Sequence, residues 1–186
     1  MKGYIYTMYA GADPSHGWTM NDPIFGKVPT LGACVPNIRR VVEEGDYIFV
    51  ISGRIPGQRQ FVVGGMQVKE KIDALAAYRR FPEHRLKREA DGTVKGNIIV
   101  NHNGTHNALD EHSNFEKRIE NYIVGCNPTV FEKPEEFNLA RTQTVGKLEE
   151  IFRRPGDRVF DIIGRYRRMN DEQVKELLSW MRSIKQ

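Results

Sequence analysis

The stretch GACVPNIRRVVEEGDYIFVISG, residues 32–53, decides how the middle of this chain folds. Pro36 suits a first helical position, where its missing N–H would have no partner anyway. Ile38, Val41 and Val42 then recur at helical spacing. A Gly-Asp turn ends this helix, and the five residues that follow are too few and too rich in β-branched side chains to form another. We therefore expect a short helix, a turn and a buried strand that ends in Ser-Gly.

The same stretch carries charged side chains that could act on a ligand. Arg39 and Arg40 are adjacent but about 100° apart around a helix, so at most one easily points into a site shared with the strand end. Such an arginine either pairs with an acidic side chain or clamps a phosphate with its planar fork of donors. Asp46 is either a turn residue whose carboxylate bonds backbone N–H groups or a direct participant in the chemistry.

Bulk composition indicates one compact domain over residues 1–186. The chain has 186 residues, of which 39% are hydrophobic and 28% charged, as in ordinary soluble proteins. No apolar run approaches the roughly 18 residues that cross a bilayer. The N-terminus enters strand-like residues directly, without the apolar stretch and cleavage site of a signal peptide. We expect a cytoplasmic protein with no membrane partner; the sequence leaves its oligomeric state open.

Cysteine spacing argues against metal and disulfide chemistry. Cys34 and Cys126 are far apart and belong to no Cys-x-x-Cys or Cys-His pattern. Two small buried thiols are the expected interpretation. We expect no metal and no cofactor.

Positive charge is concentrated near the end of the chain. The net charge is +4, and one short segment holds six arginines against two aspartates, with Phe160 and Tyr166 interleaved. These arginines are Arg153, Arg154, Arg158, Arg165, Arg167 and Arg168. Such a patch either binds the phosphate backbone of a nucleic acid or is a solvated face. A second basic stretch lies between Arg79 and Arg88.

The remaining pattern predicts an α+β fold. Short strands are expected at residues 2–9, 47–52, 60–69, 97–101 and 119–124, with a Gly-Gly bulge in the third. Helices are expected at 73–80, from Thr142 onward, and from an Asn170 N-cap to the end, where an amphipathic helix forms. Residues 158–166 fit a helix or a strand. The order suits a small, strongly bent mixed sheet or barrel with helices at its ends: a barrel-like core over 1–140 and a mainly helical, basic part over 141–186.

Several of these residues carry a resemblance to a known family. The Ile38-Arg39-Arg40 helix, the Gly45-Asp46 turn and the Ser52-Gly53 strand end resemble the nucleotide modification associated domain 2 family. The strand order also resembles PUA, ASCH and EVE domains, small bent barrels that bind RNA or modified DNA bases. The resemblance implies an association with modified nucleotides, and it carries over Arg39, Arg40, Asp46, Ser52 and Gly53 as motif residues.

Histidines and aromatic residues offer further candidates. His102, His106 and His112 lie in a polar loop in which Asn103-Gly104 argues against a helix, and so against a two-histidine metal site. A plain polar loop, a metal site or a single histidine acting as a general acid or base all remain open. Tyr9 and Trp18 flank His16 in the first loop and either stack on a base or pin that loop to the core.

These observations favour a nucleic-acid-associated binding domain that holds a base or nucleotide, with a modified base indicated by the resemblance. Its ligand-binding residues would be Tyr9, His16, Trp18, Arg39, Arg40, Asp46, Ser52 and Gly53, with the six late arginines on phosphates. The first alternative is an enzyme of nucleotide or DNA base modification that uses Asp46 or a loop histidine for proton transfer. The second is a protein interaction module without a nucleotide ligand.

Overall fold

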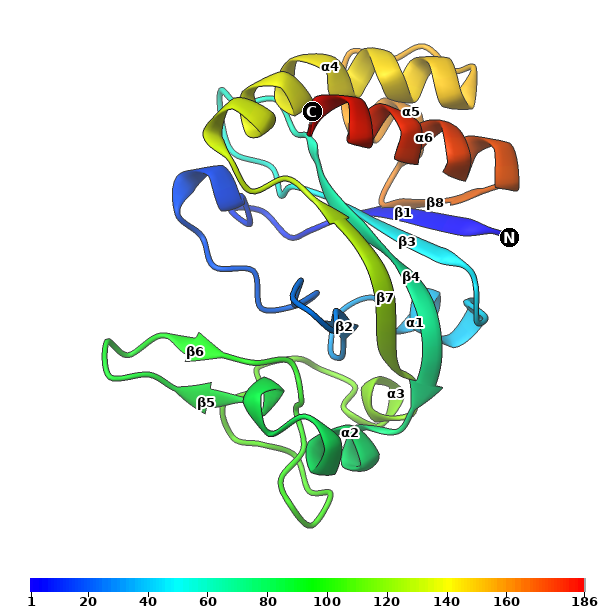
Figure 1. The fold of residues 1–186 in the computed structure, drawn as a ribbon. Helices are drawn as coiled ribbons and strands as arrows, with labels where there is room; N and C mark the ends of the chain where they lie inside the picture. The colour runs from blue at the N-terminus through cyan, green and yellow to red at the C-terminus, as the bar shows by residue number, and fades with distance from the viewer. Residues whose placement is uncertain (186) are drawn as a thin grey trace. The chain divides into compact units, whose positions relative to one another are not determined.

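The computed structural model describes residues 1–185 and confirms an α+β fold (Figure 1). Its main sheet is mixed and six-stranded, in the order β2-β7-β4-β3-β1-β8, and a separate two-stranded sheet pairs β5 with β6. The six-stranded sheet is bent and open, since β2 and β8 are its two edges. The strands are β1 (Gly3–Thr7), β2 (Thr30–Leu31), β3 (Tyr47–Ile51), β4 (Val62–Ile72), β5 (Lys87–Arg88), β6 (Val94–Lys95), β7 (Tyr122–Val130) and β8 (Tyr166–Met169).

Six α-helices and two short 3-10 helices complete the described part of the chain. They are α1 (Pro36–Val41), α2 (Ala74–Arg80), α3 (Glu116–Ile119), α4 (Pro134–Phe152), α5 (Val159–Ile163) and α6 (Asp171–Ile184), with η1 (Pro14–His16) and η2 (Pro82–His84). None of the helices in the described residues is both long enough and apolar enough to span a bilayer.

The chain divides into two compact units. Unit 1 contains residues 1–19, 45–67 and 127–185, and unit 2 contains residues 20–44 and 68–126. Strands β4 and β7 each begin in one unit and end in the other. The interpretation of residues 1–186 as one domain, with a core over 1–140, stays a prediction.

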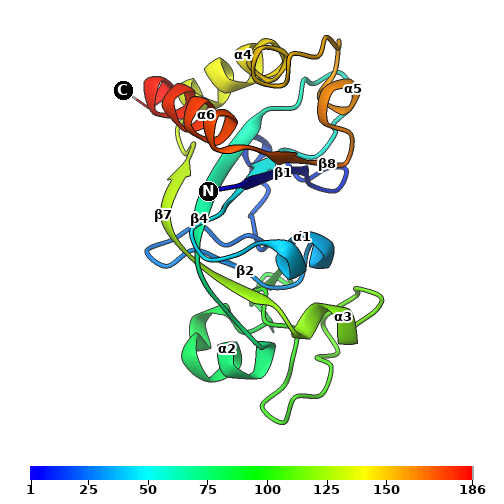
Figure 2. The same ribbon diagram turned by 90° about the vertical axis from the view of Figure 1, so that its right-hand side faces the viewer.

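Unit 1 is a sheet with helices on one face (Figure 2). β1 lies parallel to β3 and antiparallel to β8, so the first and last strands of unit 1 are neighbours. The last helix begins as predicted: Asn170 accepts from the backbone N–H of Gln173, whose side chain accepts from the N–H of Asn170. The apolar stripe of α6 is buried against the sheet and α4.

Unit 2 is built around a smaller core with many polar neighbours. β2 pairs with the first half of β7, and the buried side chains of α2 pack against Phe81, Ile98 and Tyr122. Residues 101–114 form a polar loop without a helix or strand, as predicted for the segment that carries His102, His106 and His112.

Several predicted elements have different bounds. Residues 97–101 form only isolated bridges, such as Arg85 with Ile98, rather than a regular strand. β7 runs through Gly125 and Pro128 to Val130, because its second half continues beside β4, as the Phe131 N–H bond to the Val63 carbonyl shows. α4 begins at Pro134 rather than Thr142, since proline supplies the first helical position.

The ambiguous segment 158–166 contains both elements. α5 occupies residues 159–163, and Gly164 then leaves the helix at φ 67°, a conformation that favours glycine. β8 begins two residues later.

Candidate functional site

The first loop, which follows β1 and carries Tyr9, His16 and Trp18, folds onto the carboxyl ends of β1 and β3 in unit 1. The N–H of Met8 donates to the carbonyl of Ile51 at 3.0 Å, and the N–H of Gly53 donates to the carbonyl of Ala12 at 2.6 Å. A Cβ at Gly53 would lie 1.8 Å from the backbone oxygen of Tyr9, so only glycine permits this approach. The structure thus brings the first loop and the Ser-Gly strand end together.

The aromatic pair of this loop is partly open to solvent. The Tyr9 and Trp18 rings meet edge to face, with centroids 5.6 Å apart. Tyr9 is 61% exposed, whereas Trp18 is half-buried and His16 is exposed. The Tyr9 residue is therefore largely open to solvent.

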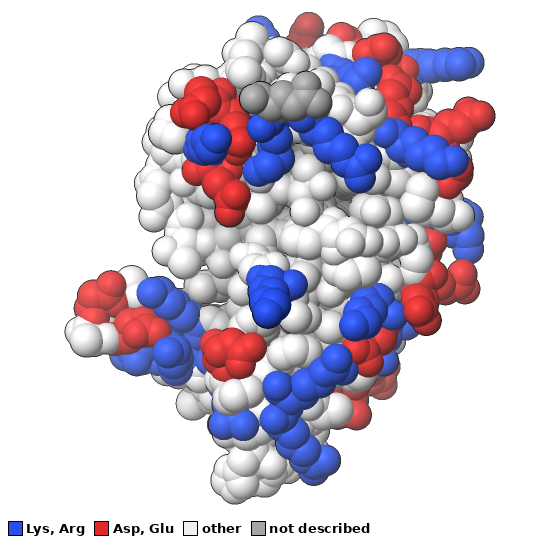
Figure 3. Space-filling model, in the orientation of Figure 1, with Lys and Arg blue, Asp and Glu red and all other residues white. Residues whose placement is uncertain are grey.

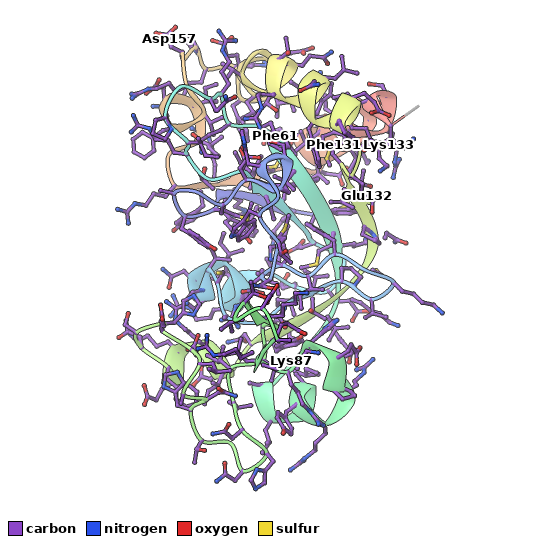
Figure 4. The ribbon with its side chains drawn as sticks, turned by 90° about the vertical axis from the view of Figure 1, so that its left-hand side faces the viewer. Phe61, Lys87, Phe131, Glu132, Lys133 and Asp157 are labelled. Atoms are coloured by element: carbon purple, nitrogen blue, oxygen red, sulfur yellow. The ribbon has the colours of Figure 1, made fainter. Side chains whose placement is uncertain are left out.

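Arg141 of α4 anchors the loop from the other side. Its guanidinium donates to Asp13 Oδ2 at 2.9 Å and to Ser15 Oγ at 2.6 Å, and it lies over the ring of Phe61 (Figure 4) at 4.6 Å. Asp13 in turn caps η1 by accepting from the backbone N–H of Ser15. The loop that carries Tyr9 is accordingly held in place before any ligand binds.

The start of β8 lies at the same end of the sheet. The N–H of Thr7 donates to the carbonyl of Arg165 at 3.1 Å, and Tyr6 pairs with Tyr166. Tyr9 follows Thr7 by two residues, and Arg165 and Tyr166 are both exposed, the latter by 52%. Arg54, also exposed, follows Gly53, and its carbonyl accepts from the N–H of Gly11.

The six arginines of the basic segment, residues 153–168, do not all have the same environment. Exposed to solvent are Arg153, Arg154, Arg158, Arg165 and Arg168. Arg167 is half-buried, lies over the Phe152 ring at 5.2 Å and donates to the carbonyl of Ile162. Arg158 forms an ion pair with Asp161 at 2.8 Å. Phe160 is 60% exposed between these cations.

Other surfaces of unit 1 carry mixed charge. Figure 3 shows basic and acidic side chains interspersed over α4 and α6, where Lys147 pairs with Glu176 at 2.9 Å. In Figure 4, Glu132 and Lys133 lie at the opposite side of unit 1 from Asp157, which belongs to the basic segment. The arginine-rich, aromatic composition is therefore a property of one end of the unit.

Two of the motif residues in unit 1 have structural partners. Asp46 accepts from the backbone N–H of Lys2 at 2.8 Å. It lies at the amino end of β3, about 20 Å from Ser52 by the rise of a strand. Ser52 is buried, and its hydroxyl accepts from the N–H of Phe61 at 3.0 Å. The structure does not bring Asp46 together with Tyr9.

Arg39 and Arg40 lie in unit 2 and differ in their exposure to solvent. Arg40 is exposed, whereas Arg39 is fully buried. The Arg39 guanidinium donates to the carbonyls of Cys34 at 2.8 Å, Arg118 at 3.0 Å and Asn121 at 2.5 Å, and to that of Ala33 at 3.2 Å. It thus ties α1 to the segment that precedes it and to the end of α3. Phosphate binding by either arginine stays a prediction.

A second cluster of reactive side chains lies in unit 2. Asp110 accepts from two imidazoles, His112 Nδ1 at 2.6 Å and His106 Nε2 at 2.8 Å, and its side chain is only 3% exposed. The other nitrogen of His112, Nε2, lies 3.9 Å from Cys34 Sγ. His102 lies exposed in the same loop, outside this cluster. Sequence spacing could not reveal the cluster, because Cys34 and His112 are 78 residues apart.

Asp22 fixes the backbone that carries Cys34. Its carboxylate accepts from the N–H groups of Gly32 at 2.7 Å and Ala33 at 2.8 Å, and also from that of Cys34. Burial, with the negative charge of Asp22 second, raises the pKa of the Cys34 thiol well above its ordinary value. The resting thiol is therefore protonated.

A buried polar chain continues behind Asp22. Asn97 Nδ2 donates to Asp22 Oδ1 at 3.0 Å, and the Tyr122 hydroxyl donates to Asn97 Oδ1 at 2.8 Å. His84 Nδ1 lies 3.0 Å from Thr30 Oγ1, and burial lowers the pKa of this histidine. Within residues 1–185, no group of three or more His, Cys, Asp or Glu side chains is arranged to hold a metal ion.

Comparison with known families places the chain. The model of the nucleotide modification associated domain 2 family matches residues 16–121. The chain belongs to this family. Comparison with curated proteins gave no match. The family's description associates the chain with nucleotide modification, and the residues matched to it include Cys34, Asp110 and His112 but end before the basic segment.

Proposed function

We propose that the protein is a nucleic-acid-associated binding protein that holds a base or nucleotide at the carboxyl ends of β1 and β3. The supporting observation is the meeting of three distant segments there: Tyr9 from the first loop, Arg54 after β3, and Arg165 with Tyr166 at the start of β8. Membership of a family associated with nucleotide modification supports a nucleotide as the ligand.

Tyr9 is the stacking residue in this proposal. Its exposed ring is braced edge-on by Trp18, and a loop tied to α4 through Arg141 holds it without further ordering on binding. Base stacking on an aromatic face contributes about 1–3 kcal/mol. A base that stacks here has left its duplex or belongs to a single strand, and a modified base is the proposed ligand.

Arginines supply the contacts to phosphate. The Arg165 carbonyl accepts from the N–H of Thr7, two residues before Tyr9, and the other exposed arginines of the basic segment lie on either side of Arg165 in the sequence. Tyr166 and Arg168 lie on one side of β8 because alternate strand residues point the same way, while Arg167 packs on Phe152. Exposed guanidinium groups bind phosphates with little loss of existing bonds.

Salt-dependent binding of single-stranded oligonucleotides, with and without a modified base, tests this function. Replacing Arg165 and Arg168 with glutamine should lower the slope of log affinity against log salt by about 1.4, because each phosphate contact on a single strand contributes about 0.7. Tyr9→Ala should weaken binding at least 5-fold and reduce the preference for the modified base, because a stacking face is lost. As a control, Arg182→Gln removes one positive charge from α6, and it should leave binding unchanged.

Two results would overturn the proposal. One is equal weakening by Arg182→Gln and by the arginine changes in β8, which would indicate only a general charge effect. The other is no salt-dependent binding to any oligonucleotide, which would favour a protein interaction module.

A further inference from the structure

Unit 2 holds a thiol, an imidazole and a carboxylate in the order that activates a nucleophile. Asp110 accepts a hydrogen bond from His112 Nδ1. The other ring nitrogen, Nε2, then carries the lone pair and lies 3.9 Å from Cys34 Sγ. A nucleophile, a base and a residue that orients the base are the elements of a catalytic triad, which is recognised by geometry rather than sequence order.

We propose that Cys34 is a nucleophile, with His112 as its general base and Asp110 as the positioning residue, acting on an acyl or amide carbon of a nucleotide-derived substrate. The nucleotide part of this substrate class rests on the family membership. The thiol chemistry rests on the geometry of unit 2 and does not depend on the surface of unit 1.

The backbone around Cys34 is held in an unusual conformation. Val35, a β-branched residue, has φ 43°, a left-handed conformation that is rare for such side chains. Strain of this kind persists only where surrounding contacts enforce it. Here Asp22 holds the three N–H groups before Val35, and Arg39 holds the carbonyls of Ala33 and Cys34.

Arg118 joins the two segments that carry the reacting groups. Its Nη1 donates to the carbonyl of Ala33 at 2.6 Å, and its Nε donates to the carbonyl of Ser113 at 2.8 Å. Ser113 follows His112, so one guanidinium fixes the histidine loop against the segment of the cysteine. These bonds use Nε and Nη1 of a cation that lies close enough to Cys34 to favour its thiolate, against the effects of burial and Asp22 on the thiol pKa.

The protonated resting thiol determines how the reaction proceeds. Because burial and Asp22 favour the neutral thiol, activation requires proton transfer to His112 Nε2 as sulfur bonds to the substrate carbon. The bond from that carbon to its leaving nitrogen or oxygen then breaks, and the leaving group takes the proton from His112. Water, deprotonated by His112, next attacks the thioester, which releases the acid and returns the proton to sulfur.

His106 distinguishes this cluster from a simple triad. It donates to the second oxygen of Asp110 at 2.8 Å and stacks on Phe115 with ring centroids 4.3 Å apart. Asp110 therefore cannot rotate away from His112 without losing a second partner, which fixes the carboxylate as the positioning group. The groups facing His112 are Asp110 and Cys34, with the Arg118 cation nearby.

p-Nitrophenyl acetate is a suitable probe, since attack by Cys34 releases nitrophenolate and leaves one acetyl group on the sulfur. The full chain should give an initial burst of nitrophenolate, and peptide mass spectrometry should find the acetyl group on Cys34. Cys126→Ala should leave the burst unchanged, while Cys34→Ala should abolish it. Acetylation of Cys126 at an equal rate, or of neither cysteine, would overturn the proposal.

Variants of the exposed loop test the roles of the other two residues without threatening the fold. His112→Gln keeps the size of the side chain but removes the base, so acetylation of Cys34 should slow about 100-fold. It should also change how the rate depends on pH, because the group that accepts the thiol proton is gone. Asp110→Asn should slow acetylation about 10-fold, and His102→Gln should change nothing. An unchanged rate and pH profile in His112→Gln would refute the role of His112.

Discussion

Units 1 and 2 use their polar side chains differently. At the end of β1 and β3 in unit 1, arginines and aromatic rings are exposed and make few contacts with the protein. In unit 2, Arg39 of the motif is buried against four carbonyls, and His112 Nε2 lies 3.9 Å from Cys34 Sγ. Exposed guanidinium groups suit reversible binding of phosphates, whereas an enforced cluster suits chemistry.

The matched family residues sharpen this contrast. Residues 16–121 contain the complete Cys34 cluster, while the basic segment lies beyond them. The matched part of the chain therefore contains the enforced geometry, whereas the basic segment lies outside it.

Arg39→Met should have the largest effect on stability. It removes a buried guanidinium and leaves the carbonyls of Cys34, Arg118 and Asn121 without this donor, while that of Ala33 keeps only its bond from Arg118, at an expected cost of about 3–5 kcal/mol. Hydrogen exchange should show lost protection in unit 2. Arg40→Met, on the exposed neighbour, should change stability by less than about 0.5 kcal/mol. Equal loss of hydrogen-exchange protection in both units would contradict the difference inferred between units 1 and 2.

Gly53→Ala probes the corresponding fixed point in unit 1. Its Cβ would collide with backbone atoms of Tyr9 and Ala12, which cannot move without shifting the first loop. The free energy of unfolding should fall by about 2–3 kcal/mol. Oligonucleotide binding should weaken as well, whereas the acetylation rate of Cys34 should stay the same. A change in that rate would show that the two sites are not independent.

The buried His84 of unit 2 should give that unit a pH dependence. Because burial lowers its pKa in the folded protein below the ordinary 6.5, the unfolded chain binds the proton more readily. The stability of unit 2 should therefore fall as pH decreases through 6.5 toward the lower folded pKa. His84→Gln should cost about 1–2 kcal/mol at neutral pH and remove this dependence. Urea unfolding at several pH values measures both, with His102→Gln as the control that leaves the slope intact.

Gly146→Ala should produce the smallest effect and one of opposite sign. Gly146 lies within α4, and a Cβ there meets no atom within 4 Å. Alanine should raise the free energy of unfolding by about 0.5–1 kcal/mol, since it lowers the entropy of the unfolded chain. Thermal unfolding of unit 1 measures the gain; a loss of stability would mean that α4 has a partner on that face.

The sequence by itself determined the local elements and the family. Pro36 and the apolar spacing after it predicted α1, alternation predicted β1, a short β-branched run after a Gly-Asp turn predicted β3, and the Asn170 cap predicted α6, since these signals act over a few residues. The sequence also shows the concentration of arginine in residues 153–168, while its role in binding phosphate stays a prediction.

Only the tertiary structure decided what the buried polar residues do. From the sequence, Arg39 could pair with an acidic side chain or clamp a phosphate, whereas the partners in the structure are carbonyls of residues up to 82 positions away. Cys34 looked like an inert thiol until the loop of residues 101–114 brought His112 to its sulfur. Hydrogen bonds between distant segments depend on how the chain closes on itself, and no local pattern of residues encodes that closure.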